Sequence, residues 1–378
     1  MKKVLLAAAA AILALQLNAQ HIVKGSIEGV PAQGSYHPTF SCDGASYTPK
    51  NIILMIGDGT GLAQIAAGYF ANNEELTLFN LKHMGFVTTK SATDYTTDSA
   101  ASGTAYATGQ KTYNYAVGVD VQNRPIANIP EKVTGSGIIS GIVTTDNMDG
   151  ATPASFYAHQ PNRAMINEIW ADLPGAPIQY FAAGNKECFE ERPADIQKAV
   201  KKAYTIVNSL DDPACATAKK LGVLPPAVET GFIVDGRTDF LPKATRQAIE
   251  FLDSHKEEGK GWFLMVEGAR IDKACHGNDF PSAVKELLDF DKAIAEAIKF
   301  ADKDGNTLIV ISADHETGGL VIWDGDPSKG NGEGVYTTGG HTAIPVPIFA
   351  YGPHAQDFMG AQGNEQVAQK ILKLLLSK

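Results

Sequence analysis

The stretch NIILMIGDG, residues 51–59, is an unbroken apolar run that ends in Gly57, Asp58 and Gly59. A run without alternating polar residues is typical of a strand that is buried on both faces, as in parallel sheets. Asp58 then follows the carboxyl end of the strand. Because ligands of open parallel sheets bind beyond the carboxyl ends of the strands, Asp58 is a candidate functional residue.

The same pattern, an apolar run next to acidic residues or histidine, recurs along the chain. The further runs are 137–144 before Asp146 and Asp149, 262–266 before Glu267, 307–312 before Asp314 and His315, and 345–350 after His341. Helical patterns at 241–255 and 281–301 separate them. Strands that alternate with helices predict an α/β fold with a central, mainly parallel β-sheet covered by helices on both faces. Residues 165–240 show no clear pattern.

The N-terminus has the pattern of a signal peptide over residues 1–19. Two lysines precede an apolar run too short to span a membrane, and a small residue precedes the expected cleavage point. Gln20, not cysteine, follows that point, so no lipid anchor is expected. The chain is therefore expected to be periplasmic or secreted. Residues 20–378 are expected to form a single catalytic domain with a short glycine-rich surface insertion near 323–340.

The chain carries a formal net charge of −10. This acidic balance argues against a surface for nucleic acid or for anionic membranes. An anionic substrate would then need local positive charge, such as that of metal ions.

Four cysteines, at 42, 188, 215 and 275, allow three complete pairings in an oxidising compartment. The sequence alone does not decide between them. Cys188 with Cys215 is the favoured pair, because it closes a modest loop in the least patterned region. Cys275 is expected to be a small buried packing residue.

Ser99 lies in TTDSAASGTAYATG, residues 96–109, which is rich in small residues. Asp98 and Ser99 are good N-cap residues, so this stretch alone predicts a short helix and a serine that only caps it. A serine hydroxyl can also act as a nucleophile where a metal ion activates it. The two interpretations are compatible, since a helix N-terminus adds backbone donors to an anion site.

Histidines and carboxylates in the second half of the chain could hold metal ions. Asp272 and His276 are four residues apart and share one face if that segment is helical. Asp314 and His315 are adjacent, and His341 follows two glycines. Each feature alone also fits an ordinary protein surface. Three histidines with several carboxylates at one sheet edge suit zinc, with oxygen ligands left for magnesium.

Six motifs follow one another along the chain: IGDG, TDSAASGTA, ATPASFYAH with NR shortly after it, EGARIDKACH, ADHETGG and GGHT. In order and approximate spacing, from residue 50 to about residue 360, they resemble the alkaline phosphatase family in its compact bacterial form. The resemblance implies a three-layer α/β sandwich and an enzyme that hydrolyses phosphate monoesters with broad specificity. It also implies two zinc ions, one magnesium ion and a homodimer as a candidate assembly.

The resemblance further implies residue roles. Ser99 resembles the nucleophile that becomes phosphorylated and contacts the metal ions, Arg163 the phosphate clamp, and Lys273 a lysine near the phosphate. The implied metal ligands are Asp272, His276 and His341 for the first zinc, Asp58, Asp314 and His315 for the second, and Asp58, Thr152 and Glu267 for magnesium.

One position departs from the family pattern. Gly150 stands where many members have Asp or His before the Ala-Thr-Pro triplet. This leaves the surroundings of the magnesium site open, but not the zinc pair. Asp149, one residue earlier, is expected to pair with Lys273.

Two other functions fit parts of the pattern. A phosphodiesterase or sulfatase of the same superfamily is disfavoured, because Arg163 and the magnesium ligands suit a dianionic phosphoryl group better than a singly charged diester. A phosphate- or metal-binding protein without catalysis is disfavoured because no expected ligand, nucleophile or clamp is missing. No residue that the sequence identifies reads the leaving group of the substrate.

Overall fold

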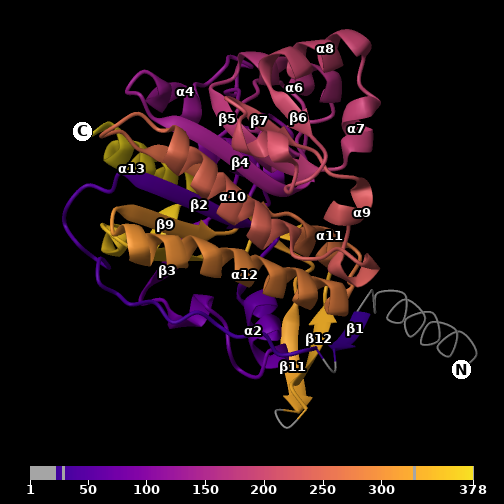
Figure 1. Cartoon of the computed structure of the whole chain (residues 1–378). Coiled ribbons are helices and arrows are strands. Elements are labelled where there is room, and N and C mark those ends of the chain that lie inside the picture. Colours follow the sequence, from indigo (N-terminus) through magenta and orange to yellow (C-terminus); the bar gives the residue numbers. More distant parts are fainter. Residues whose placement is uncertain (1–22, 28–29, 327–328, 378) are drawn as a thin grey trace, which may run out of the picture.

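The computed structural model describes residues 23–27, 30–326 and 329–377, so the expected signal peptide at 1–19 lies outside the described residues. A ten-stranded sheet runs through the centre of the molecule (Figure 1). In spatial order its strands are β15 (Gly360–Gly363), β3 (His83–Thr88), β14 (Val346–Tyr351), β9 (Thr307–Ser312), β2 (Asn51–Gly57), β8 (Trp262–Gly268), β4 (Ile139–Asn147), β5 (Ile178–Gly184), β7 (Leu221–Val223) and β6 (Thr205–Val207).

Neighbouring strands of this sheet are parallel except at β14, which is antiparallel to both β3 and β9. The predicted α/β fold with a mainly parallel sheet is therefore confirmed. The strands β9, β2, β8 and β4, whose sequences lead into acidic residues, are the four neighbours at the centre. The apolar run at 345–350 also enters the sheet, but in the reverse direction.

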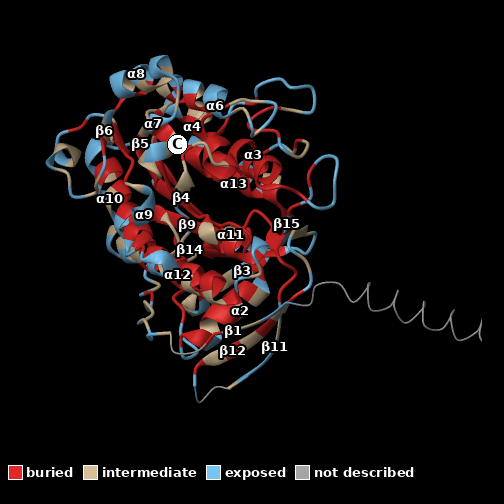
Figure 2. Ribbon diagram, turned by 90° about the vertical axis from the view of Figure 1, so that its right-hand side faces the viewer, coloured by how far each residue is buried: buried red, intermediate tan, exposed pale blue. Residues whose placement is uncertain are grey.

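The sheet separates two clusters of buried side chains, as strand β2 shows, because successive side chains of a strand point to opposite faces of the sheet. Ile53 and Met55 belong to one cluster of buried side chains, and Ile52, Leu54 and Ile56 belong to the other. The first face packs against α2 (Leu62–Ala71), α10 (Phe240–His255), α11 (Arg270–His276) and α12 (Phe280–Asp304). The second packs against α3 (Ser99–Thr108), α4 (Ile129–Thr134), α5 (Ala151–Ala154), α6 (Ile166–Asp172), α7 (Lys186–Glu190), α8 (Ala194–Ala203) and α13 (Asn364–Leu376). Figure 2 shows the buried residues gathered along the sheet and the inner sides of these helices.

Helix α3 begins at Ser99 and is buried along its whole length. The carboxylate of Asp98 caps it by accepting a hydrogen bond from the Ala101 N–H at 3.0 Å. Small residues in this helix allow close packing, since a Cβ added at Gly103 would lie 3.3 Å from Thr152 Cα. The predicted helix is confirmed, with Asp98 as its N-cap and Ser99 as its first residue.

Most of the glycine-rich segment near 323–340 belongs to a pair of antiparallel strands. These strands are β11 (Val321–Asp326) and β12 (Asn331–Tyr336), which pair with each other. Strand β1 (Val23–Ile27), from the start of the described chain, pairs antiparallel with β12. Next along the chain, β13 (His341–Thr342) pairs with β10 (Glu316–Thr317), and Thr317 lies opposite His341. This short pairing brings His341 back to the end of β9.

The segment without a clear sequence pattern, 165–240, supplies the last three strands at one side of the sheet, β5, β7 and the edge strand β6, and the short helices beside them. These include α9 (Ala227–Thr230) and the 3-10 helices η2 (Leu173–Gly175), η3 (Pro213–Ala216) and η4 (Ile233–Asp235). Two further 3-10 helices are η1 (Leu78–Asn80) and η5 (Ala355–Phe358). Within the described residues, no helix combines the length and apolar character needed to cross a bilayer.

The favoured disulfide is wrong, because the thiols of Cys188 and Cys215 are both free. Cys188 Sγ faces the amide of Asn185, and Cys215 Sγ faces the carbonyl of Ser209. Cys275 is fully buried, as expected of a packing residue.

Candidate active site

Three acidic residues meet where the central strands β2, β8 and β9 end. Ile56 of β2 is paired with Glu267 of β8 and with Ser312 of β9. Asp58 and Asp314 follow two residues after these positions, and all three carboxylates are buried. The sheet therefore brings together acids that are far apart in the sequence, as expected from the strand ends.

The first candidate metal group consists of Asp58, Asp314 and His315, whose ligand atoms all lie within 4.8 Å of one another. His315 Nε2 is 3.0 Å from Asp314 Oδ2 and 3.5 Å from Asp58 Oδ1. Neither of these two oxygens accepts a well-oriented hydrogen bond. A buried carboxylate oxygen without a donor is costly, so this group suits a cation.

The second candidate metal group consists of Asp272, His276 and His341. Helix α11 places Asp272 and His276 one turn apart, as predicted, and the β10–β13 pairing adds His341. The Nε2 atoms of the two histidines are 3.1 Å apart. Their Nδ1 atoms face backbone carbonyls, of Gly339 at 2.7 Å and of Thr97 at 2.9 Å.

Those carbonyl contacts determine which nitrogen of each neutral imidazole carries the proton. A carbonyl only accepts, so each neutral ring carries its proton on Nδ1 and turns an unprotonated Nε2 toward the other ring. Two lone pairs at that separation repel each other unless a cation lies between them. Backbone contacts of this kind also orient histidine ligands in metal sites.

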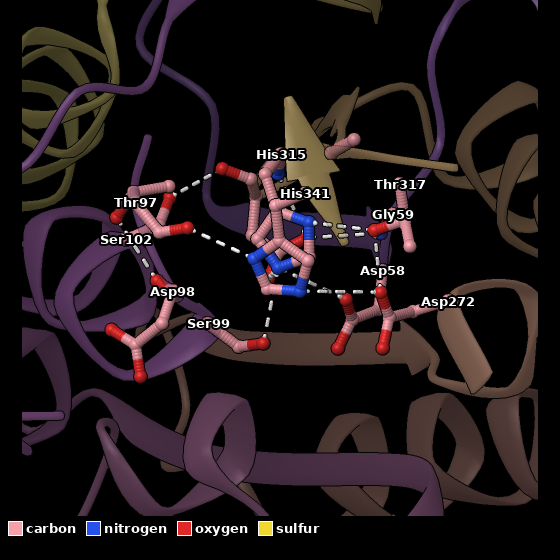
Figure 3. Close-up of polar contacts among 12 residues, drawn as sticks. Asp58, Gly59, Thr97, Asp98, Ser99, Ser102, Asp272, His315, Thr317 and His341 are labelled. Atoms are coloured by element: carbon pink, nitrogen blue, oxygen red, sulfur yellow. Dashed lines mark hydrogen bonds and ion pairs between the residues drawn. The ribbon is translucent and has the colours of Figure 1, made fainter. Parts of the chain in front are cut away.

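Thr317 connects the two groups. Its hydroxyl donates to Asp272 Oδ1 at 2.5 Å, so it must accept from His315 Nδ1, 3.1 Å away. When its ring is neutral, His315 therefore also presents an unprotonated Nε2 to the site. Figure 3 shows the rings of His315 and His341 packed together, with centroids 3.5 Å apart, between Ser99 on one side and Asp58 and Asp272 on the other.

The electrostatics of the site reflect an excess of acids. Burial, together with the neighbouring Asp314, raises the pKa of Asp58 well above its usual range. Burial, together with Asp146, raises the pKa of Glu267 to about 8. Although burial opposes its ionisation, Asp314 has its pKa lowered to about 2 by His315. A bound cation would favour the ionised form of all three carboxylates.

Ser99, Asp98 and Arg163 line one cleft with Asp272, His276 and His341, and the cleft has a volume of about 360 Å³. Ser99 Oγ lies 3.1 Å from His315 Nε2. Arg163 Nη1 lies 3.2 Å from Asp98 Oδ2. The serine at the start of α3 thus lies next to both candidate metal groups and to a guanidinium.

Thr152 and Glu267, the predicted magnesium ligands besides Asp58, are both buried near this edge of the sheet. Thr152 Oγ1 has no hydrogen-bond partner. Glu267 accepts a hydrogen bond from Thr144, a residue that the sequence did not single out. An unpartnered hydroxyl next to a buried carboxylate fits the oxygen ligands that magnesium prefers.

The expected pairing of Asp149 with Lys273 is wrong. Lys273 Nζ instead binds Asp146 Oδ1, while Asp149 Oδ1 is buried without a partner. Gly150 leaves room for this arrangement, since a Cβ added there would lie 2.7 Å from Asp146 Oδ2. The sequence offered Asp146 and Asp149 after the same strand, with no signal to choose between them.

Sequence reasoning also missed Thr317 and the contacts that Asp98 makes. Asp98 Oδ1 accepts hydrogen bonds from both Ala101 and Tyr115, each at 3.0 Å. Thr317 lies within the ADHETGG motif, so a test of that motif's polar residues could have found it. Tyr115 lines the cleft and carries no signal in the motifs.

Comparison with known proteins identifies the family. The family model for alkaline phosphatase matches residues 49–187 and 232–332, more than half of the chain. The chain is 32% identical to alkaline phosphatase 4 of Bacillus subtilis, over 86% of this chain and 88% of that protein. It is 30% identical to the alkaline phosphatase of Escherichia coli K12, over 82% and 83% of the two chains.

Solved structures agree. The alkaline phosphatase of the Antarctic bacterium TAB5 superposes with a TM-score of 0.81 and 36% identity, over 87% of this chain and 98% of that one. A variant of that enzyme has magnesium bound in its M3 site. This chain therefore belongs to the alkaline phosphatase family. It is a phosphomonoester hydrolase, and its relatives imply metal cofactors.

Proposed function

We propose that this enzyme is an exported alkaline phosphatase that hydrolyses phosphate monoesters through a phosphoserine formed on Ser99. The position of Ser99 carries the proposal. Its Oγ lies at the N-terminus of a buried helix, 3.1 Å from His315 Nε2, in a cleft that Arg163 also lines. Candidate metal ligands and a guanidinium surround this hydroxyl, and such groups stabilise developing negative charge.

Two zinc ions and one magnesium ion suit the available donors. The proposed ligands are Asp272, His276 and His341 for one zinc, Asp58, Asp314 and His315 for the other, and Asp58, Thr152 and Glu267 for magnesium. The mixed nitrogen and oxygen sets suit zinc, and the set of oxygens alone suits magnesium. When bound, these ions supply positive charge that favours the serine alkoxide and the departing oxygen.

Ser99 Oγ attacks the phosphorus in line with the ester oxygen. The new bond from Oγ to phosphorus forms as the ester bond breaks, the serine proton passes to solvent, and the departing alkoxide takes a proton from water. Water then attacks the phosphoserine, which releases inorganic phosphate and restores the serine hydroxyl. Phosphoryl transfer depends mainly on position and charge, which the rigid start of α3 provides.

Arg163 binds the phosphoryl oxygens. A guanidinium has five N–H donors, so its ion pair with Asp98 leaves donors for two phosphate oxygens at once. The unpaired N–H groups at the start of α3 add to this anion site. Lys273, oriented by Asp146, adds positive charge nearby.

We also propose that residues 1–19 direct export and that residues 20–378 form one catalytic domain. The basis is the basic, apolar and small-residue pattern at the N-terminus. A periplasmic or secreted location follows from this signal. Broad specificity is proposed because five of the ten residues that line the cleft belong to the proposed phosphate and metal contacts.

Hydrolysis of a chromogenic aryl phosphate at alkaline pH tests the mechanism. The purified enzyme is assayed as isolated, after chelation, and after zinc and magnesium are added back, with Ser99→Ala in parallel. We expect activity to disappear on chelation, to need both metals for full recovery, and to fall at least a thousandfold in the variant. Full activity in chelated enzyme, or in Ser99→Ala, would overturn the proposal. Trapping of a phosphorylated Ser99 by acid quench would identify the intermediate.

A further inference from the structure

Tyr115 has a backbone conformation that tyrosine rarely adopts. Its φ is 75°, in the left-handed region. It is the third residue of the turn 113–116, which is closed by a hydrogen bond from the Ala116 N–H to the Tyr113 carbonyl at 3.3 Å. A positive φ at the third position of a turn strongly favours glycine, and a bulky residue there is an outlier.

The turn is fixed at both sides of Tyr115 by residues of the phosphate site. The Tyr115 N–H donates to Asp98 Oδ1 at 3.0 Å, and the Tyr115 carbonyl accepts from the Arg163 N–H at 2.8 Å. The unfavourable backbone conformation is therefore held by Asp98 and Arg163, the ion pair whose guanidinium is proposed to bind the phosphoryl group. Strained residues of this kind cluster at functional sites.

The side chain of Tyr115 lines the cleft and is 58% exposed. Across the described residues, no ring or cation stacks on it and its hydroxyl makes no hydrogen bond. Among the other residues that line the cleft, only His276 and His341 carry rings. Both are assigned to metal, so of the described residues lining the cleft Tyr115 alone offers a free aromatic face to the rest of the substrate.

We propose that Tyr115 is a specificity-determining residue that stacks on the leaving group of aryl phosphate monoesters. An aromatic face prefers a flat apolar group at stacking distance to water. Tyr115 lines the same cleft as Ser99 and Arg163, so a leaving group that extends from the bound phosphoryl group along this cleft reaches its ring. This inference rests on the proposed function, because it assigns a contact within the same cleft.

Replacement of Tyr115 by glycine is the direct test, because the turn accommodates glycine and the fold is retained. The kcat/KM values of phenyl phosphate and ethyl phosphate are compared in wild type, Tyr115→Gly and Tyr115→Phe, with thermal unfolding as a check on folding. We expect the phenyl-to-ethyl ratio to fall roughly three- to tenfold in Tyr115→Gly and to stay within twofold in Tyr115→Phe. In Tyr115→Gly the inhibition constant of phenylphosphonate should rise by the same factor relative to that of methylphosphonate, a comparison that needs no turnover.

Tyr95 provides the matched control, since it is 82% exposed in the same part of the chain but does not line the cleft. Tyr95→Gly should keep the wild-type ratio. An unchanged ratio in Tyr115→Gly, or an equal loss for both substrates, would overturn the inference. Failure of the proposed function would look different, because wild type would then hydrolyse neither ester in a metal-dependent way.

Discussion

Two clusters of buried carboxylates in this molecule differ in the source of their positive charge. In one, Arg237 binds Glu286 at 2.5 Å and Asp289 at 2.7 Å, and its side chain is fully buried. In the other, Asp58 and Asp314 lie beside His315 only, and no lysine or arginine of the described chain forms an ion pair with either. The first cluster contains a permanently charged guanidinium, whereas the only basic group paired with the acids of the second, within the described residues, is an imidazole.

This difference separates a structural cluster from a candidate metal site. Arg237 and its partners attach the loop after η4 to helix α12, since Glu286 also accepts a hydrogen bond from the Ile233 N–H. Both clusters leave buried oxygen atoms without donors, among them Asp58 Oδ1 and Asp314 Oδ2 in the second and Asp289 Oδ1 in the first, so the difference lies in the ion pairs with Arg237. Buried charge needs a partner, so the second cluster suits a cation from solution, whereas the first contains an arginine.

Removal of the internal cation should have the largest effect. Arg237→Leu leaves two carboxylates buried without a counter-charge, and we expect the free energy of unfolding to fall by about 3–5 kcal/mol. Chemical denaturation measures this loss, and zinc or magnesium should not reverse it. Arg246→Leu is the control, because its pair with Glu296 is exposed and worth less than about 1 kcal/mol. Equal losses in the two variants would contradict the role assigned to Arg237.

Removal of the external cation should come next. Chelation should lower the free energy of unfolding by about 3 kcal/mol, if the free ions had been about a hundredfold above their dissociation constants. Thermal unfolding with and without chelator measures the difference. The same decrement is expected in Arg246→Leu, whose substitution is remote from the site. A chelator without effect on unfolding would mean that the acidic cluster is balanced without metal.

Neutralising one acid of the second cluster should have opposite effects in the two states. In chelated protein, Asp58→Asn removes a carboxylate whose pKa is raised by burial. We therefore expect the free energy of unfolding to rise by about 2 kcal/mol. In metal-loaded protein the same change should reduce both activity and the stabilisation by metal. Differential scanning calorimetry of both states gives the comparison. The exposed Asp211→Asn should change neither, and a destabilised chelated Asp58→Asn would refute the expected excess of negative charge.

The first cluster should show its own pH dependence. Burial raises the pKa of Asp289 to about 7, despite the nearby Arg237. Between about pH 4 and pH 7 the folded state therefore binds a proton that the unfolded state has lost, so stability falls as pH rises through this range. In Asp289→Asn the decline should be shallower, by at most about 1.4 kcal/mol per pH unit. Urea denaturation across this range measures it, and parallel curves would rule out titration of Asp289.

Asp146 is the intermediate case, an acid beside the second cluster that has its own cation in Lys273. Asp146→Asn should remove the ion pair that orients Lys273 and lower kcat/KM three- to tenfold, which corresponds to about 1 kcal/mol. The magnesium concentration needed for full activity should also rise. Asp149→Asn is the matched control, because Asp149 does not contact Lys273. A larger loss of kcat/KM in Asp149→Asn would instead support the pairing of Asp149 with Lys273 that was expected from the sequence.

The sequence predicted the central strands and the gathering of the candidate site residues at one edge of the sheet, for a common reason. Apolar runs such as residues 51–56 are long enough to identify a doubly buried strand, and parallel strands place their carboxyl ends at one edge. The acidic residues at the ends of β2, β8 and β9 are therefore expected to lie close together. The spacing of Asp272 and His276 likewise determined a shared helix face, which α11 confirms.

Other features depend on contacts that no local pattern records. Strands β6 and β7, at one side of the sheet, have three residues each, which is too few for a periodic signal. The register of β4 with β5 shifts between Val143 and Asn147, so alternation cannot tell which following acid turns toward Lys273. The cysteine pairing failed because separation in sequence says little about the distance between thiols.

The pairing of β1 with β12 has a consequence for how the chain acquires its shape. Val23 lies opposite Tyr336, more than 300 residues later in the sequence. During synthesis from the N-terminus, β1 therefore emerges long before its partner exists, and such distant pairings form slowly. The strand that is made first is expected to be among the last to dock, so the small outer sheet completes folding after the catalytic core has formed.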